Sequence, residues 1–134
     1  MKKAFFIILF FLIVCLSGCK VEHPVIVLNS NPITKNNIYD IEQTFGRNKR
    51  VYYAVLSPKG FKDNVIRVQI IKKDEKTQHW GYSIYDSQEK NIDTNKKFYL
   101  DYFITREKGY YIIQIFELRN LSKPIARNDF GVFE

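Results

Sequence analysis

The sequence predicts a mainly β domain, an antiparallel β-sandwich that follows an N-terminal signal helix. Short runs of β-branched and aromatic residues recur along the chain, and polar or Gly-containing stretches separate them. After residue 46 no periodic helical pattern exceeds two turns. About six or seven short strands at this spacing are typical of an antiparallel sandwich or barrel. A jelly roll or a small barrel is the alternative architecture.

The strands of this domain can be placed in order from residue 51 onward. Residues 51–56 form an apolar run that ends at a Ser-Pro-Lys-Gly turn signal. Residues 65–71 alternate between apolar and polar, which directs Ile66, Val68 and Ile70 inward. The remaining predicted strands cover residues 80–85, 98–104, 110–116 and 125–133.

The stretch before residue 50 allows more than one interpretation. The apolar residues 25–28 could form a first strand. Residues 37–46 fit a short helix that is capped by Asn37 and ended by Gly46. They fit a strand and a turn equally well, because Ile and Tyr also favour extended backbone.

The N-terminus has the features of a secretory signal peptide. Lys2 and Lys3 precede an apolar run, and small residues follow it. The run weakens at Ser17 and Gly18, before it reaches the roughly 20 residues that a membrane-spanning helix needs. We therefore expect a cleaved signal peptide over residues 1–18. An uncleaved membrane anchor is the alternative.

The residues that end this leader, Leu16-Ser17-Gly18-Cys19, resemble the lipobox of bacterial lipoproteins. The resemblance implies lipidation of the Cys19 thiol and cleavage between Gly18 and Cys19 by the lipoprotein signal peptidase. Two or three acyl chains, such as palmitate, anchor a protein stably. The resemblance therefore implies a lipid anchor in a membrane of the cell envelope. If the host has two membranes, Lys20 in place of a retention Asp implies the outer membrane.

After cleavage we expect a lipidated tether over residues 19–37, which could include the first strand, and a β-sandwich domain over residues 38–134. The mature chain has the size of one typical domain. Its cysteines are Cys15 and Cys19, and Cys15 leaves with the signal peptide. The mature domain is therefore expected to contain no intramolecular disulfide.

The segment Glu107-Lys108-Gly109-Tyr110-Tyr111 resembles the tyrosine corner at the start of strand F in immunoglobulin-like sandwiches. The resemblance implies that the Tyr111 hydroxyl bonds back to a nearby backbone group, and that an F–G hairpin follows. It covers about the last third of the chain. The cysteine pair of antibody domains is missing and Trp80 has no clear place on strand C. The resemblance is therefore to the wider immunoglobulin-like architecture.

No constellation of catalytic, cofactor or metal-binding residues is visible in the sequence. His23 and His79 lack partners at zinc-ligand spacing, and the acidic loop expected from residue 86 lacks EF-hand spacing. Asp101 and Glu117 could face a cleft, although strand alternation places them more simply on the outer face of a sheet. We predict no enzymatic activity, no cofactor and no metal. A small hydrolase with an unrecognised site is an alternative.

Charge and aromatic content are compatible with a binding role, and each also has a simpler structural explanation. The formal net charge of +7 falls to +5 when Lys2 and Lys3 leave with the signal peptide. In the envelope this charge suits anionic lipid, teichoic or polysaccharide acids, or acidic protein faces better than nucleic acid. Turn and edge-strand lysines that simply block edge-to-edge pairing are the simpler explanation. Neighbouring strand residues alternate between faces, so some strand tyrosines must point outward, although cross-strand packing is the simpler explanation for them. These tyrosines are Tyr52, Tyr53, Tyr82, Tyr85, Tyr99, Tyr102, Tyr110 and Tyr111.

These features together predict a membrane-tethered lipoprotein with a non-enzymatic domain that binds or assembles with a protein partner in the envelope. The alternative is a surface-exposed lipoprotein that binds host or environmental ligands.

Overall fold

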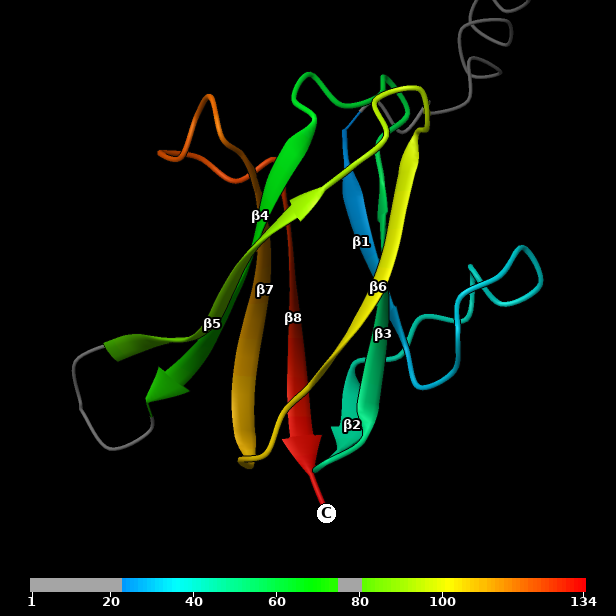
Figure 1. The fold of residues 1–134 in the computed structure, drawn as a ribbon. Coiled ribbons are helices and arrows are strands. Elements are labelled where there is room, and N and C mark those ends of the chain that lie inside the picture. Colours follow the sequence, from blue (N-terminus) through cyan, green and yellow to red (C-terminus); the bar gives the residue numbers. More distant parts are fainter. Residues whose placement is uncertain (1–22, 75–80) are drawn as a thin grey trace, which may run out of the picture.

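The computed structural model describes residues 23–74 and 81–134 (Figure 1). The predicted signal peptide, the cleavage site at Gly18 and Cys19, His79 and Trp80 lie outside the described residues. Within them every regular element is a strand. The strands are β1 (Val25–Asn29), β2 (Thr44–Gly46), β3 (Arg50–Leu56), β4 (Val65–Asp74), β5 (Gly81–Asn91), β6 (Phe98–Ile104), β7 (Gly109–Glu117) and β8 (Ala126–Phe133).

The strands form a small and a large sheet. The small sheet has the order β1-β3-β6, and the large sheet has the order β2-β8-β7-β4-β5. All pairs are antiparallel except β2 and β8, which run parallel. The prediction of a mainly β, mostly antiparallel fold is confirmed.

The core lies between the two sheets, and each sheet contributes alternate side chains to it. In β4 the predicted inward residues Ile66, Val68 and Ile70 are buried, and Arg67 and Gln69 between them are half-buried. Each large apolar side chain that is removed from water in this way stabilises the fold by about 1.5–3 kcal/mol. The main cluster consists of Ile26, Leu28, Phe45, Val51, Tyr53, Val55, Phe61, Ile66, Val68, Ile70, Phe103, Tyr111, Ile113, Ile115, Ala126, Phe130 and Val132.

Residues 37–46 form a turn and the short strand β2, and the helix interpretation is wrong. The Asn37 side chain accepts a hydrogen bond from the Thr34 N–H at 2.7 Å and donates one to the Pro32 carbonyl at 3.0 Å. Asn37 therefore closes a turn that precedes it and does not cap a helix that follows it. Short polar side chains that bond to local backbone favour turns over helix for this reason.

β1 lies within the segment that we expected to be the tether. Its residues Ile26 and Leu28 belong to the main core cluster. Asn128 of β8 donates to the Ile26 carbonyl at 2.9 Å, which ties β1 to the large sheet. The folded part of the described chain therefore begins near Val25, ahead of the expected boundary at residue 38.

β5 is longer than the sequence predicts. The expected acidic loop from residue 86 is strand as far as Asn91, and these residues pair with the first half of β4. β5 lies at the edge of the large sheet, where polar side chains reach solvent without disrupting the strand. Hydrophilic composition therefore does not end this strand.

The start of β7 contains the hydrogen bond that the tyrosine-corner resemblance implies. The buried Tyr111 hydroxyl donates to the Glu107 carbonyl at 2.6 Å. Gly109 between them has φ of 144°, a conformation that residues with a Cβ rarely adopt. The Tyr111 ring stacks on Phe130 at 5.3 Å and meets the edge of Tyr85 at 5.4 Å. Tyr111 therefore joins the loop before β7 to the aromatic centre of the core.

We expect Tyr111→Phe to lower the free energy of unfolding by about 1 kcal/mol, because it removes one hydrogen bond and keeps the ring. Burial, and then the neighbours Tyr85 and Glu107, raise the pKa of Tyr111 from 10.0 to about 12. The neutral hydroxyl therefore stabilises the fold fully below pH 10, and this contribution is lost as the pH rises toward 12. Urea unfolding at several pH values measures both effects.

The matched control for this substitution is Tyr110→Phe, because the Tyr110 side chain is half exposed. Equal stability of the two variants at neutral pH would show that the Tyr111 bond contributes nothing. A difference between wild type and Tyr111→Phe that stays constant up to pH 12 would contradict the raised pKa.

Candidate interaction surface

Four exposed apolar side chains lie in a row on the outer face of β6. Phe98, Leu100, Tyr102 and Ile104 are 46%, 47%, 44% and 44% exposed. Alternation along a strand puts these four on one face and the residues between them on the other. We call these four residues the β6 row. Contiguous exposed apolar surface of this kind marks interaction sites in many soluble proteins.

The neighbouring strand β3 widens this surface. The register pairs Tyr52 with Tyr102, and the two rings lie 5.7 Å apart between centroids. The Arg50 guanidinium lies 4.6 Å above the centre of the Tyr102 ring. Aromatic side chains and Arg are enriched at the centres of protein interfaces, because they combine a large contact area with polar groups.

The loop between β1 and β2 covers the part of the outer face that β1 and the neighbouring residues of β3 form. Ile33 from the loop packs with Val27 of β1 and Ala54 of β3 in a second, smaller core cluster, with Ile38 against it. The buried Asn29 side chain donates to the Asp40 carbonyl at 2.8 Å and holds the loop in place. The loop therefore leaves the β6 row uncovered.

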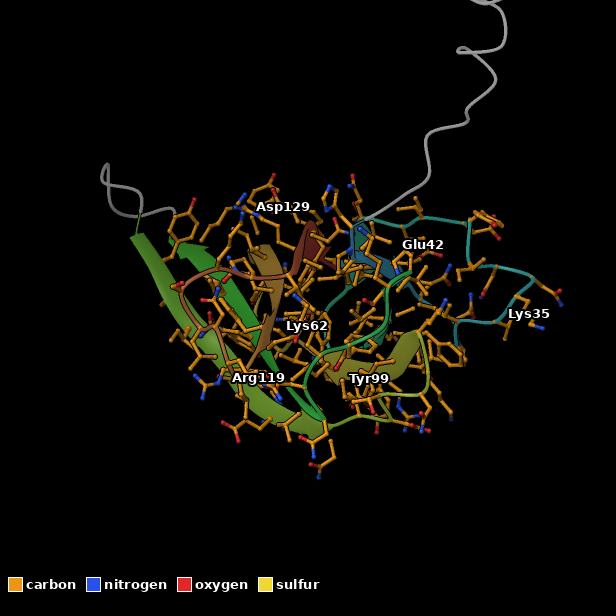
Figure 2. All side chains as sticks on the ribbon, turned by 90° about the horizontal axis from the view of Figure 1, so that it is seen from above. Lys35, Glu42, Lys62, Tyr99, Arg119 and Asp129 are labelled. Carbon is orange, nitrogen blue, oxygen red and sulfur yellow. The ribbon has the colours of Figure 1, made fainter. Side chains whose placement is uncertain are left out.

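A groove separates this loop from the β6 row. Its larger part has a volume of about 480 Å³ and is lined mainly by apolar side chains. A second hollow of about 280 Å³ adjoins it and shares Ile33 and Leu100 with it. Tyr39 stands at the rim and is 89% exposed. In Figure 2 the part of the loop that carries Lys35 extends away from the strands. The groove is suited to apolar side chains of a partner.

Three of the four sheet edges have features that hinder pairing with another strand. Two carbonyls of β1 already accept hydrogen bonds, that of Ile26 from the Asn128 side chain and that of Leu28 from the Glu42 N–H. β2 has only three residues. β5 has a register shift opposite Ile70 and Ile71 and is largely polar. Short, bulged or charged edges limit strand addition.

The fourth edge, that of β6, is occupied at its centre by Asp101. One carboxylate oxygen accepts the Tyr102 N–H at 2.8 Å. The other accepts the Tyr99 hydroxyl at 2.9 Å and the Lys90 ammonium of β5 at 3.1 Å. Asp101 is aligned with the core residue Tyr53 in the register, so it lies on the inner face. The expectation that Asp101 lies on the outer face is wrong, because these inner partners stabilise its charge there.

The surroundings of Asp101 determine its protonation. Burial alone would raise its pKa, but the Tyr102 N–H, Lys90 and the Tyr99 hydroxyl outweigh burial and lower it. A general acid must hold a proton near neutral pH, and Asp101 does not meet this condition. Its partner Lys90 lines an open hollow of about 230 Å³ together with Asp86 and Tyr102. The arrangement is that of an ion pair between the sheets.

The predicted tyrosines are divided between core and surface. Tyr53 and Tyr111 are buried, and Tyr52, Tyr85 and Tyr99 are partly buried. Tyr82, Tyr102 and Tyr110 are about half exposed. Among these tyrosines, Tyr102 belongs to the β6 row and Tyr52 packs against it. The sequence did not reveal the other members of the row, Phe98, Leu100 and Ile104, because nearly every residue of segment 98–104 is apolar. Their period-two spacing and the single carboxylate at Asp101 were the available signals.

We expect Asp101→Asn to lower the free energy of unfolding at pH 7 by about 1–2 kcal/mol, discounted for partial exposure. Because the pKa of Asp101 is lowered in the fold, its carboxylate stabilises the protein above the unfolded pKa near 3.8. This contribution is lost as the pH falls through the folded pKa. Chemical denaturation across the acid range should therefore show the variant and wild type converging.

The control here is Asp40→Asn, an exposed carboxylate in the loop before β2, which should change stability by less than about 0.5 kcal/mol. If Asp101→Asn behaved like this control at pH 7, Asp101 would not hold β5 and β6 together.

Within residues 23–74 and 81–134 no helix is long and apolar enough to cross a bilayer. The same described residues contain no group of three or more His, Cys, Asp or Glu side chains that could hold a metal ion. Neither a protein-family model nor a curated protein matches this chain.

Proposed function

We propose that this chain is a bacterial envelope lipoprotein whose immunoglobulin-like domain, anchored by lipid on Cys19, binds a protein partner through the β6 row. The domain acts as a binding or assembly module and catalyses no reaction. The observation that carries the proposal is the row of four half-exposed apolar side chains beside an apolar groove.

The lipid anchor is supported by the lipobox at residues 16–19 behind a signal peptide. Val25, the first residue of β1, follows Cys19 after only five residues. A lipidated Cys19 would therefore keep the domain close to the membrane. Confinement at a membrane raises the effective concentration of a domain toward partners in the same membrane. An envelope protein is thus the class of partner that the anchor favours.

The order of the strands supports an immunoglobulin-like architecture. If β1, β3 and β6 are strands A, B and E, the small sheet has the order A-B-E of such domains. Then β4, β7 and β8 are strands C, F and G, which are neighbours in the large sheet, and β5 lies where C′ lies. The Tyr111 bond falls at the start of the strand F equivalent. No described strand pairs with β6 in the place of strand D.

The position of β6 supports binding through the face of the sheet. Asp101 already occupies the centre of the β6 edge and accepts the Tyr102 N–H. A partner strand would have to displace this charged side chain, whereas the β6 row is accessible without rearrangement. Burying the four side chains in an interface would remove apolar surface from water, which is the main favourable term in protein association.

Photocrosslinking in intact cells tests the binding surface. A photoreactive phenylalanine analogue at Tyr102 or Phe98 should give a discrete adduct with one envelope protein. The same analogue at Tyr82 or Ile84 of β5 is the matched control, because these side chains are 50% and 65% exposed on the other sheet. Adducts of equal yield from both strands, or none from β6, would contradict the β6 row as a binding surface. An adduct with a host or environmental molecule would assign the alternative function.

The anchor is tested in the same cells with Cys19→Ser. This substitution should abolish labelling by a fatty-acid analogue and prevent processing to the mature size, because the acceptor thiol is gone. Unchanged labelling would refute lipidation at Cys19. The crosslinking experiment would still test, independently, whether the β6 row is a binding surface.

A further inference from the structure

Three loops meet at the end of the domain from which the chain leads back to Cys19. They span residues 57–64, 92–97 and 118–125, and together they are called the loop end. The register places Val25, Leu56 and Phe98 side by side at this end of the small sheet. In the large sheet it places Val65 beside Asn91, and Ile66 beside Glu117. Figure 1 shows these loops and the start of β1 together at the top of the domain.

The loop end is strongly basic. Its three loops contain six basic side chains against two acidic ones, Asp63 and Asp93. Asp63 is largely covered, and its carboxylate accepts two hydrogen bonds from Arg119, at 2.7 Å from Nε and 3.0 Å from the backbone N–H. The basic residues are all exposed: Lys59, Lys62, Lys96, Lys97, Arg119 and Lys123.

Hydrogen bonds between the loops hold these charges in one surface. The Ser57 N–H donates to the Lys97 carbonyl at 2.8 Å, and the Ile92 N–H donates to the Asn64 carbonyl at 2.8 Å. The Arg119–Asp63 pair ties the third loop to the first. The surface includes a hollow of about 480 Å³ that His23 and Pro24 line together with residues of the first and third loops and with Glu117 at the end of β7. The first described residue of the chain is thus part of this surface.

We infer that the loop end docks on anionic lipid headgroups of the membrane in which Cys19 is anchored. This inference rests on the proposed lipid anchor. Cys19 lies four residues before His23, and four residues span at most about 14 Å when fully extended. The anchor therefore keeps the loop end within about one to two Debye lengths of the bilayer surface, where basic side chains are attracted to anionic lipid.

The opposite end of the domain is less suited to this role. The basic residues described in the loops at this end are Arg47, Lys49, Arg106 and Lys108. Lys108 is already paired with the carboxylate of Glu134, and the nearby Lys72 is paired with that of Glu107. The described chain begins with His23 at the loop end, so the proposed attachment at Cys19 favours the loop end over this one. With the loop end on the bilayer, β6 runs away from the membrane and its outer row is accessible from the side.

Lysine labelling on vesicles tests the docking. The acylated mature protein is reconstituted into vesicles of phosphatidylcholine alone or of phosphatidylcholine with phosphatidylglycerol. A membrane-impermeant amine reagent is added, and labelling is quantified by peptide mass spectrometry relative to Lys35. We expect labelling of Lys62 and Lys123 to fall about threefold or more in the anionic vesicles, and to recover in high salt. Lys49 should be labelled equally in both vesicles.

A pair of charge-reversal variants checks the cause. In the wild type Lys96 and Lys97 should be protected on anionic vesicles in the same way as Lys62 and Lys123. Lys62→Glu/Lys123→Glu should abolish this protection of Lys96 and Lys97. Lys35→Glu/Lys49→Glu makes the same change of charge away from the loop end and should preserve that protection. Protection that is unchanged by the first variant would overturn the inference.

Further outcomes separate this inference from the proposed function. Equal labelling of Lys62 and Lys123 in both vesicle types, with acyl chains seen in the intact mass, would overturn the docking and leave the anchor standing. An intact mass without acyl chains would overturn the anchor and the docking together. Protection by a soluble polyglycerol phosphate but not by phosphatidylglycerol would assign the loop end to envelope polymers and overturn lipid docking.

Discussion

The inward position of Asp101 on β6 determines which side chains of that strand reach solvent. Its carboxylate accepts the Tyr99 hydroxyl and the Lys90 ammonium, and both partners lie toward the space between the sheets. Because side chains alternate, a shift of β6 by one residue would turn Asp101 outward and reverse every face of the strand. The ion pair with Lys90 therefore favours the register in which the β6 row is exposed.

The same interaction explains why the face of the sheet, and not its edge, is the available surface. Lys90 and Asp101 connect β5 of the large sheet to β6 of the small sheet at the open side of the core. The second carboxylate oxygen of Asp101 caps the Tyr102 N–H and so blocks strand addition at the middle of the edge. Protection from edge pairing and exposure of an apolar face are thus two consequences of one side chain. The basic loop end is compatible with both, since it lies at one end of the strands.

Local patterns in the sequence predict most strands but not how they are arranged. The alternation of residues 65–71 correctly predicts the buried face of β4. The Asn37 turn could not be distinguished from a helix cap, because the same side-chain chemistry serves both. The β6 row could not be recognised, since residues 98–104 have almost no polar contrast. The Lys90 partner that places Asp101 inward comes from another sheet, and no local pattern reveals such a contact.

The basic loop end depends even more than the single strands on the topology of the fold. Lys62, Lys97 and Lys123 belong to basic positions that are far apart in the sequence, and they come together only because three loops meet at one end. The length of β5 was also underestimated, because an edge strand tolerates polar residues that elsewhere indicate a loop. Strand propensity is local, whereas register, edges and the gathering of loops depend on contacts between distant segments.

The most direct test of the central claim is cysteine scanning of β6, with Cys19 acylated. In purified protein, cysteines at Leu100 and Tyr102 should react rapidly with a thiol reagent, and those at Tyr99 and Phe103 slowly. In intact cells the partner should protect the first pair, while a control cysteine at Ile84 of β5 should react equally in both settings. Rapid reaction at Tyr99 and Phe103 would contradict the register of β6, and unprotected Leu100 and Tyr102 in cells would contradict binding at the β6 row.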